Sequence, residues 1–171
     1  NNMLEYGHTY YVTIDNGVLN LADGSFQGVT KEDEWIFTTK SDMPELSDTL
    51  IVDATGKGDF NTVQGALDFI PDFNERQTVI LVNPGDYEEL VYARNKWNVK
   101  IKGAGMTDTK VHYANNEVFN PHPLTVKTNE WPGTFPSRRA AFMLDNCKDM
   151  IVEDITIATD LKGQAEGLLL N

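Results

Sequence analysis

The chain has 171 residues, of which 40% are hydrophobic and 23% charged, a composition typical of globular rather than disordered or membrane-spanning proteins. Its net charge of -12 argues against sequence-independent binding of nucleic acid, which requires a basic surface. No apolar run reaches the roughly 18 residues that span a bilayer, and residues 1–12 do not resemble a signal peptide, so a signal for export is expected upstream. Because Cys147 is the only cysteine, an intrachain disulfide and a cysteine-based zinc cluster are excluded.

Residues 1–40 alternate apolar and polar side chains between closely spaced turn signals. The dipeptides Asn16-Gly17 and Asp23-Gly24 favour tight hairpin turns, so a small antiparallel β piece of three or four strands is expected. The YYVTI strand, the D-x-x-G turn and the final W-x-F-T-T strand resemble the C-terminal half of a bacterial Ig-like domain. Since a sandwich needs about seven strands, either earlier strands lie upstream or the piece packs on a second domain.

Residues 41–49, SDMPELSDT, are polar, contain a proline and show no period, which predicts a linker. The following segment, residues 50–171, consists of short apolar runs separated by Asn, Gly and Asp turns. These runs are LIVDA, TVILVNPG, NVKIKGAG, TKVHYA, AAFMLDN, MIVEDITIA and EGLLLN. Because no long helices separate them, a doubly wound α/β fold is not expected. Short strands at irregular spacing favour a parallel β-helix, in which each coil stacks on the previous one.

One short helix is predicted over residues 60–70, within the stretch DATGKGDFNTVQGALDFIP. Asp59 or Thr62 can cap its first free amides, and Pro71 disfavours its continuation. Four apolar residues recur at helical spacing and form a face to bury: Val63, Ala66, Leu67 and Ile70. Because the end of a β-helix exposes strand edges and apolar side chains, this helix is interpreted as the cap on the N-terminal coil.

Four blocks occur in a recognisable order along the second segment. They are GDFNTVQGAL at 58–67, NPGDYEELV at 83–91, IKGAG at 101–105, and DITIAT with QAEGL at 154–159 and 164–168. In this order the blocks resemble the opening half of a pectinesterase. The resemblance implies a right-handed parallel β-helix with an N-terminal capping helix. It also implies hydrolysis of the methyl esters of pectin (polygalacturonate) without a metal or other cofactor.

In that family one aspartate attacks the ester carbonyl, a second acts as acid and base, glutamines donate to the oxyanion, and an arginine orients the nucleophile. The resemblance makes Gln164 the first oxyanion glutamine and places the other motifs beyond Asn171, so the chain is interpreted as an N-terminal fragment, inactive alone. The family has two small apolar residues where Glu166 and Gly167 stand. By strand alternation Glu166 shares a face with Gln164, so an extra carboxylate is expected there. The alternative is that Gln164 only hydrogen-bonds between coils.

Substrate-binding candidates follow from the same resemblance and from residue type. Thr134 in WPGTF corresponds to a substrate-lining threonine, and its alternative is a turn residue in a surface loop. Trp131 could stack on a sugar ring, as could Phe135 and Tyr113, although local packing is the alternative. The Arg138-Arg139 pair could attract galacturonate carboxylates or be solvated.

Metal sites are not expected. The three histidines, His8, His112 and His122, lack metal-ligand spacing. An acidic stretch, Asp145, Asp149, Glu153, Asp154 and Asp160, could suggest calcium, but solvated turns explain it and no D-x-D-x-D-G loop is present.

The leading hypothesis is a secreted, periplasmic or cell-surface pectin esterase. The alternatives are a non-catalytic polysaccharide-binding or surface β-helix module and a calcium-dependent, pectate lyase-like enzyme. A last prediction concerns Leu168, Leu169 and Leu170, which are expected on an open coil with unpaired strand edges. Such an end favours self-association.

Overall fold

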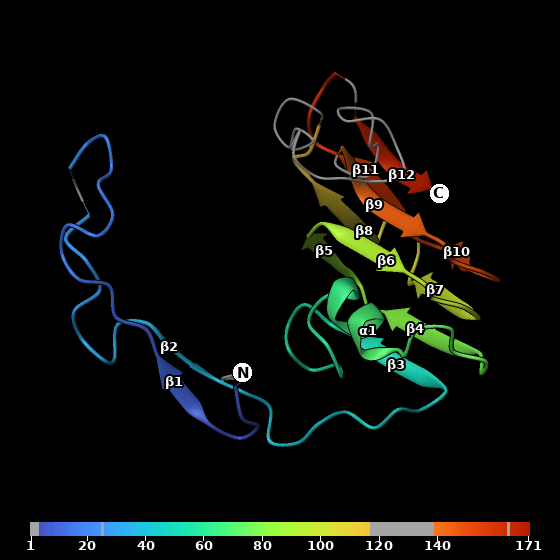
Figure 1. Cartoon of the computed structure of the whole chain (residues 1–171), viewed down its shortest axis with the longest axis horizontal. Helices are drawn as coiled ribbons and strands as arrows, with labels where there is room; N and C mark the ends of the chain where they lie inside the picture. Colours follow the sequence, from blue (N-terminus) through green and yellow to red (C-terminus); the bar gives the residue numbers. More distant parts are fainter. Residues whose placement is uncertain (1–3, 25, 117–138, 164) are drawn as a thin grey trace. The chain divides into compact units, whose positions relative to one another are not determined.

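The structure is a computed structural model that describes residues 4–24, 26–116, 139–163 and 165–171 (Figure 1). The chain divides into two units, Asn1–Glu45 and Leu46–Asn171. Among the described residues the first unit contains two short strands, and the second contains ten strands and one helix. No helix in these residues is both long enough and apolar enough to cross a membrane.

The first unit is a narrow antiparallel pair. Strand β1 (Thr9–Tyr11) pairs with β2 (Ile36–Thr38), and the ring of Tyr10 stacks on that of Phe37 at a centroid distance of 5.6 Å. An isolated antiparallel bridge, Ile14 with Val29, extends the pairing. The antiparallel pairing expected for this unit is therefore present between the segment that contains β1 and the segment that contains β2.

The middle of the first unit differs from the sequence-based expectation. The two dipeptides form turns, with φ of 87° at Gly17 and 66° at Gly24, and the Gly24 amide donates to the Leu21 carbonyl at 2.9 Å. However, no strand lies between residues 15 and 28 in the part that the structure describes. No described residue from 4 to 45 is buried, so this unit has no core against which another strand could pack. The expectation of three or four strands was wrong for this part, and the Ig-like assignment stays a prediction.

The second unit is built from three parallel sheets. One has the order β10-β7-β4-β3, the second β11-β8-β5 and the third β12-β9-β6. The strands are β3 (Thr49–Val52), β4 (Thr78–Val82), β5 (Gly85–Glu88), β6 (Val91–Arg94), β7 (Val99–Gly103), β8 (Thr109–Tyr113), β9 (Ala140–Asp145), β10 (Ile151–Glu153), β11 (Thr156–Thr159) and β12 (Glu166–Leu170). Because the chain visits the sheets in turn and each strand pairs in parallel with its counterpart one circuit earlier, the unit is a parallel β-helix (Figure 1).

The core of the β-helix consists of side chains stacked in register from coil to coil. Leu50 on β3 is opposite Ile80 on β4, which is opposite Ile101 on β7, and all three are fully buried. Along β4 and β7 the alternate residues face outward, as the pleat of a strand requires. This stacking explains why the apolar runs in the sequence are short and separated by turns.

Helix α1 (Val63–Phe69) covers the N-terminal end of the β-helix, as predicted. Thr62 is its N-cap and accepts a hydrogen bond from the Gly65 amide at 3.0 Å, whereas Ile70 has left the helical conformation before Pro71. The four residues predicted to form its apolar face are all buried: Val63, Ala66, Leu67 and Ile70. The helix begins three residues later than expected, because residues 53–61 form the capped turn that precedes it.

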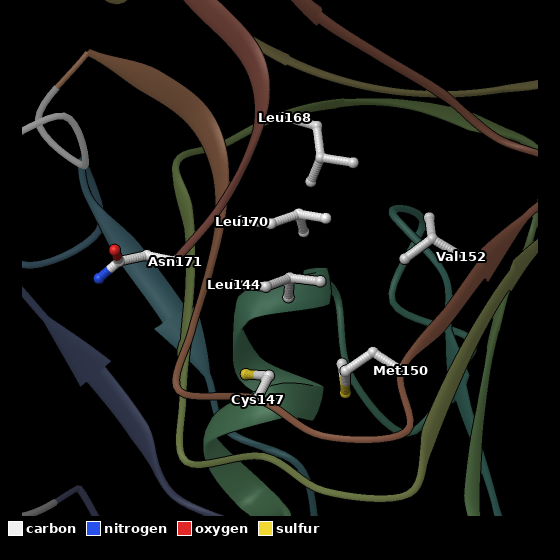
Figure 2. A pocket seen from close by; sticks show the side chains of 7 residues that line it. All are labelled: Leu144, Cys147, Met150, Val152, Leu168, Leu170 and Asn171. Atoms are coloured by element: carbon white, nitrogen blue, oxygen red, sulfur yellow. The ribbon is translucent and has the colours of Figure 1, made fainter.

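The opposite end of the β-helix is open. In the described part of the chain, β10, β11 and β12 each pair on one side only. A cavity of about 300 Å³ opens at this end between β9, β10 and β12 (Figure 2). It is lined by Leu144, Cys147, Met150, Val152, Leu168, Leu170 and Asn171. Leu168 and Leu170 are 41% and 68% exposed, while Leu169 lies on the other face of β12 in register with Met143.

Candidate active site

The residues predicted for the site, Gln164, Thr134 and Trp131, all lie outside the described residues. The site is therefore characterised through the elements on either side of Gln164. These are the segment after β11, residues 160–163, and the first residue of β12, Glu166. The segment after β11 lies beside the segment that follows β8, and Glu166 lies beside Arg139 and the start of β9.

Glu166 forms an ion pair with Arg139 at the start of β12. The Arg139 Nε donates to both carboxylate oxygens, at 2.7 Å to Oε1 and 2.9 Å to Oε2. Each side chain is about one-third exposed. Glu166 is opposite Ala140, the residue after Arg139, so the register of β12 on β9 brings the two charges together. The extra carboxylate expected beside Gln164 is thus paired, and Arg139 is not simply a solvated basic residue.

The segments after β8 and β11 are joined by hydrogen bonds. The Asp160 amide donates to the Tyr113 carbonyl at 3.1 Å, and the Thr159 hydroxyl donates to the Asn115 carbonyl at 2.8 Å. Farther along, the Asn116 amide group donates to the Lys162 carbonyl at 3.1 Å. This lattice supports the turn that leads to Gln164 from the previous coil.

Asn115 anchors the same lattice to the third sheet. It is 1% exposed and its Nδ2 donates to the Ala140 carbonyl at 2.9 Å. The turn after β8, the beginning of β9 and the segment after β11 therefore form one hydrogen-bonded unit.

The acidic stretch after Asp145 is paired mainly with cations. Glu153 lies 2.7 Å from Lys100 Nζ and 3.2 Å from Lys102 Nζ, and these two lysines lower its pKa. Asp154 also lies within 3.4 Å of Lys102. Among the described residues no group of three or more His, Cys, Asp and Glu is arranged to hold a metal ion. The carboxylates of this stretch act as ion-pair partners on the outer surface.

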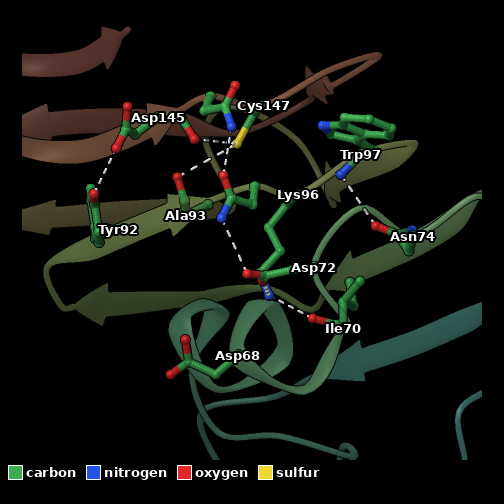
Figure 3. Close-up of polar contacts among 12 residues, drawn as sticks. Asp68, Ile70, Asp72, Asn74, Tyr92, Ala93, Lys96, Trp97, Asp145 and Cys147 are labelled. Carbon is green, nitrogen blue, oxygen red and sulfur yellow. Dashed lines mark hydrogen bonds and ion pairs between the residues drawn. The ribbon is translucent and has the colours of Figure 1, made fainter.

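Asp145 is a nearly buried carboxylate with three partners on the outer face of the third sheet. It accepts a hydrogen bond from the Tyr92 hydroxyl at 2.8 Å (Figure 3). It also accepts one from Asn171 Nδ2 at 2.9 Å, and Arg94 Nε lies 3.1 Å away. Burial, together with the hydrogen bond to Asp145, raises the pKa of Tyr92 to about 12. Because these partners satisfy the carboxylate, this cluster stabilises the coils and has no free nucleophile.

His112 was considered in the sequence only as a metal ligand, and the structure shows a different environment. Its ring lies between Asp86 of β5 and Asp160, the residue after β11. The three residues come from successive coils, 26 and 48 positions apart. Alternation along β8 is a signal from which an outward-facing His112 could have been predicted, but the register that brings the carboxylates to the ring is not readable from the sequence.

A comparison with protein families decides the relationship. The family model described as Pectinesterase matches residues 49–165, more than half of the chain. The chain belongs to the pectinesterase family. Within the match, GDFNTVQGAL enters and forms α1, NPGDYEELV spans β5 and the start of β6, and DITIAT forms β11. The family blocks therefore contribute the cap and all three sheets of the pectinesterase fold.

Individual pectinesterases match shorter parts of the chain. "Probable pectinesterase 67" of Arabidopsis thaliana is 33% identical over 96 residues, 52% of this chain and 28% of that protein. "Pectinesterase/pectinesterase inhibitor" of Ficus pumila var. awkeotsang is 33% identical over 75 residues, 43% of this chain and 14% of that protein. The chain thus spans less than a third of the length of these curated relatives.

Among solved structures, "Pectin methylesterase from Carrot" matches with a TM-score of 0.56 and 22% identity, over 75% of this chain and 37% of that one. This likeness concerns the fold. It confirms the predicted right-handed parallel β-helix.

Proposed function

We propose that the whole protein is a carbohydrate esterase that hydrolyses the methyl esters of pectin, and that this chain supplies the N-terminal coils of its β-helix. The family match over residues 49–165 is the observation that carries the proposal. The curated relatives are named as pectinesterases, and the ordered blocks extend from the capping helix to the strand after Gln164. In this arrangement residues 1–40 are a partial Ig-like segment, residues 41–49 a linker and residues 50–171 the catalytic β-helix.

The chemistry is acyl transfer by a carboxylate nucleophile. Gln164 donates to the oxygen on which negative charge develops, an interaction that is stronger in the transition state than in the bound ester. Two aspartates, a second glutamine and an arginine are expected on further coils of the whole protein. The hydrogen bonds that join residues 113–116 and 159–163 hold the segment that precedes Gln164 in the sequence, which suits a donor that must be preorganised.

Release of methanol from methylated pectin by the full-length protein tests this function. We expect release between about pH 5 and 9, and a decrease in kcat of about 100-fold to 1000-fold for Gln164→Ala. Gln77→Ala, at an exposed position before β4, serves as the matched control and retains wild-type turnover. Absence of methanol release by the wild type at every pH would exclude the esterase.

The same assay separates the alternatives. A non-catalytic polysaccharide-binding module binds pectin without releasing methanol. A calcium-dependent lyase loses its activity when a chelator is added, whereas the proposed esterase is indifferent to it. One observation favours the non-catalytic binding module. The family has a small apolar residue at the position of Glu166, whereas this chain has a carboxylate there, paired with Arg139.

Substrate contacts and location complete the proposal. Thr134 and Trp131 are proposed to line the pectin chain, so Thr134→Ala and Trp131→Ala in the full-length protein should raise KM more than they lower kcat. An unchanged KM for both would remove them from the substrate site.

A pectin-degrading enzyme acts outside the cytoplasm, so the whole protein is proposed to be secreted, periplasmic or displayed on the cell surface. Cell fractionation checks this.

Self-association through the open end of the β-helix is the proposed partner interaction of this chain. Leu170 and Leu168 are exposed beside three strands that pair on one side only, and such edges favour pairing with another chain. Light scattering of the 171-residue chain should give an apparent mass that rises with concentration. A longer protein with further coils would cover this surface itself.

A further inference from the structure

His112 lies between two carboxylates that come from the coils before and after its own. Its side chain is 13% exposed, on the outer face of the sheet formed by β5, β8 and β11. The Nδ1 atom makes a short hydrogen bond with Asp160 Oδ2. The Nε2 atom lies 2.6 Å from Asp86 Oδ1. The ring therefore bridges three successive coils.

The geometry at Nε2 indicates which protonation state fits the site. This atom is buried and makes no well-aligned hydrogen bond, yet a carboxylate oxygen of Asp86 lies 2.6 Å from it. A neutral imidazole has one N–H and one lone pair, so it can donate to only one of two carboxylates and would turn its lone pair toward the other. The imidazolium has an N–H on each nitrogen, so it donates from Nδ1 to Asp160 and pairs as a cation with the Asp86 carboxylate beside Nε2.

The charged groups around the ring reinforce this reading. Asp86 and Glu88 occupy the outward positions of β5, and Glu88 is in register with His112. Lys110 on β8 has its Nζ 3.7 Å from Asp160 Oδ1. The β11 residue beside the ring is the uncharged Ala158. Three carboxylates thus face one permanent cation, and a proton on His112 brings the charges closer to balance.

We propose that doubly protonated His112 is a positioning residue that ties Asp160 to Asp86 and so fixes the turn leading to Gln164. Loss of one proton leaves Asp160 or Asp86 facing a lone pair and loosens residues 160–163. An effect of this bridge on catalysis rests on the proposed function, in which Gln164, four residues after Asp160, stabilises the oxyanion. The effect of the bridge on residues 160–163 does not depend on that function.

The sign of the pH dependence follows from the two partners. Because the bridge requires a proton on both ring nitrogens, its contribution is lost as the pH rises and that proton dissociates. The hydrogen bond from His112 lowers the pKa of Asp160, so the contribution of that carboxylate is lost only when the pH falls well into the acidic range. The bridge is strongest between these limits.

Amide hydrogen exchange on the 171-residue chain tests the bridge without any assay of activity. After correction for intrinsic rates, protection at Asp160 and its neighbours should fall about 10-fold between about pH 5.5 and pH 8, because a bridging interaction is lost. In His112→Gln the protection should be low and independent of pH over this range. Lys110→Gln, which removes the neighbouring cation but leaves the imidazole in place, should keep a pH dependence and shift it to higher pH, because the carboxylates around the ring then lose their other cation. A wild-type pH profile in His112→Gln, or a flat profile in the wild type, overturns the proposal.

Turnover by the full-length protein gives the second readout. The ratio of kcat between wild type and His112→Gln should be about 10 at about pH 5.5 and near 1 at pH 8, with KM unchanged, because misplacement of Gln164 affects transition-state stabilisation. Equal turnover of the two proteins at both pH values would contradict the link to catalysis. If the exchange experiment gives the expected result and no methanol is released, the bridge stands and the proposed esterase does not.

Discussion

Asp53, at the end of β3, shows how one side chain can secure the turn that enters the capping helix. Its Oδ1 accepts hydrogen bonds from the Thr55 hydroxyl at 2.6 Å and the Thr55 amide at 2.8 Å, and its Oδ2 accepts one from Asn83 Nδ2 at 2.9 Å. The Thr55 hydroxyl, followed by Asn83, lowers the pKa of this carboxyl. Stability from Asp53 is therefore present above the ordinary carboxyl range and lost as the pH falls through the lowered pKa.

Replacement of this carboxylate should have a pH-dependent effect. Asp53→Asn presents an NH₂ group where Asn83 also donates, so we expect a lower Tm than wild type at about pH 6 and a difference that shrinks as the pH falls toward about 3. Thermal unfolding followed by circular dichroism at both pH values checks this. Asp42→Asn, at an exposed position of the first unit, is the control and should match wild type throughout. A difference that persists unchanged at about pH 3 would rule out the ionised form of Asp53 as the cause.

Local signals in the sequence were sufficient for residues whose partners are near in the chain. The cap and the buried face of the helix depend on spacings of three and four residues, so the face was predicted and Thr62 was one of two candidates for the cap. His112 depends on partners 26 and 48 residues away, so its environment could not be read from the sequence. The ion pair of Arg139 with Glu166 was missed for the same reason.

At the scale of elements, helix α1 is held at both ends by charged side chains that flank strand β6. At the N-terminus, the Glu89 carboxylate accepts hydrogen bonds from the Val63 amide at 2.8 Å and the Gln64 amide at 2.9 Å. At the other end, Lys96 Nζ donates to the Ile70 carbonyl at 2.6 Å and to Asp72 at 2.8 Å (Figure 3). A negative group at the start and a positive group at the end both complement the helix dipole. These contacts attach a helix of seven residues, too short to be stable alone, to the next coil.

Removal of either contact should loosen the cap. Glu89→Ala leaves two amides without their acceptor, and Lys96→Met leaves a nearly buried carbonyl without its donor. Each should lower the free energy of unfolding by about 1–3 kcal/mol, the usual range for hydrogen bonds to charged groups. Urea denaturation measures both, with Glu75→Ala at an exposed position as the control. A loss below about 0.5 kcal/mol in both variants would show that apolar packing alone holds the helix.

The strands that sequence analysis missed also have a physical explanation. β5 and β6 lie in DYEELVYAR, where only Tyr87, Val91 and Ala93 face the core and charged or polar residues occupy most outward positions. These strands have no continuous apolar run. Conversely, MIVEDITIA was treated as one run but forms β10 and β11, because Asp154 adopts a left-handed φ of 55° and turns the chain between two sheets. Corners of a β-helix are set by such single residues, which periodicity does not reveal.

At the scale of the whole molecule, the two units differ in what the sequence could predict. The second unit was predicted as a β-helix because stacked coils impose short apolar runs with inward residues in register, as Leu50, Ile80 and Ile101 are. The first unit has similar alternation in sequence but no buried residue among those described. Alternation alone therefore indicates strands reliably only where another element covers their apolar face.

The open end of the β-helix leads to the last prediction, which concerns association of the whole molecule. Leu170 is 68% exposed at the rim of the apolar cavity, and a charge there would have to be desolvated when a second copy covered the end. Leu170→Lys should therefore remain monomeric at concentrations where the wild type associates. Met106→Lys introduces the same charge at a position that is 72% exposed but outside the cavity, so it should associate like wild type.

Salt provides an independent check on the same surface. With a net charge of -12, two copies repel each other, and screening by salt weakens this repulsion while leaving apolar contacts intact. Association of the wild type should therefore increase between about 0.05 and 0.5 M salt, since the Debye length falls severalfold over this range. Multi-angle light scattering of the three proteins at both salt concentrations measures the effect. If Leu170→Lys associates as strongly as wild type, or if salt dissolves the assemblies, the contact is electrostatic or lies elsewhere on the molecule, and the open coil is not the interface.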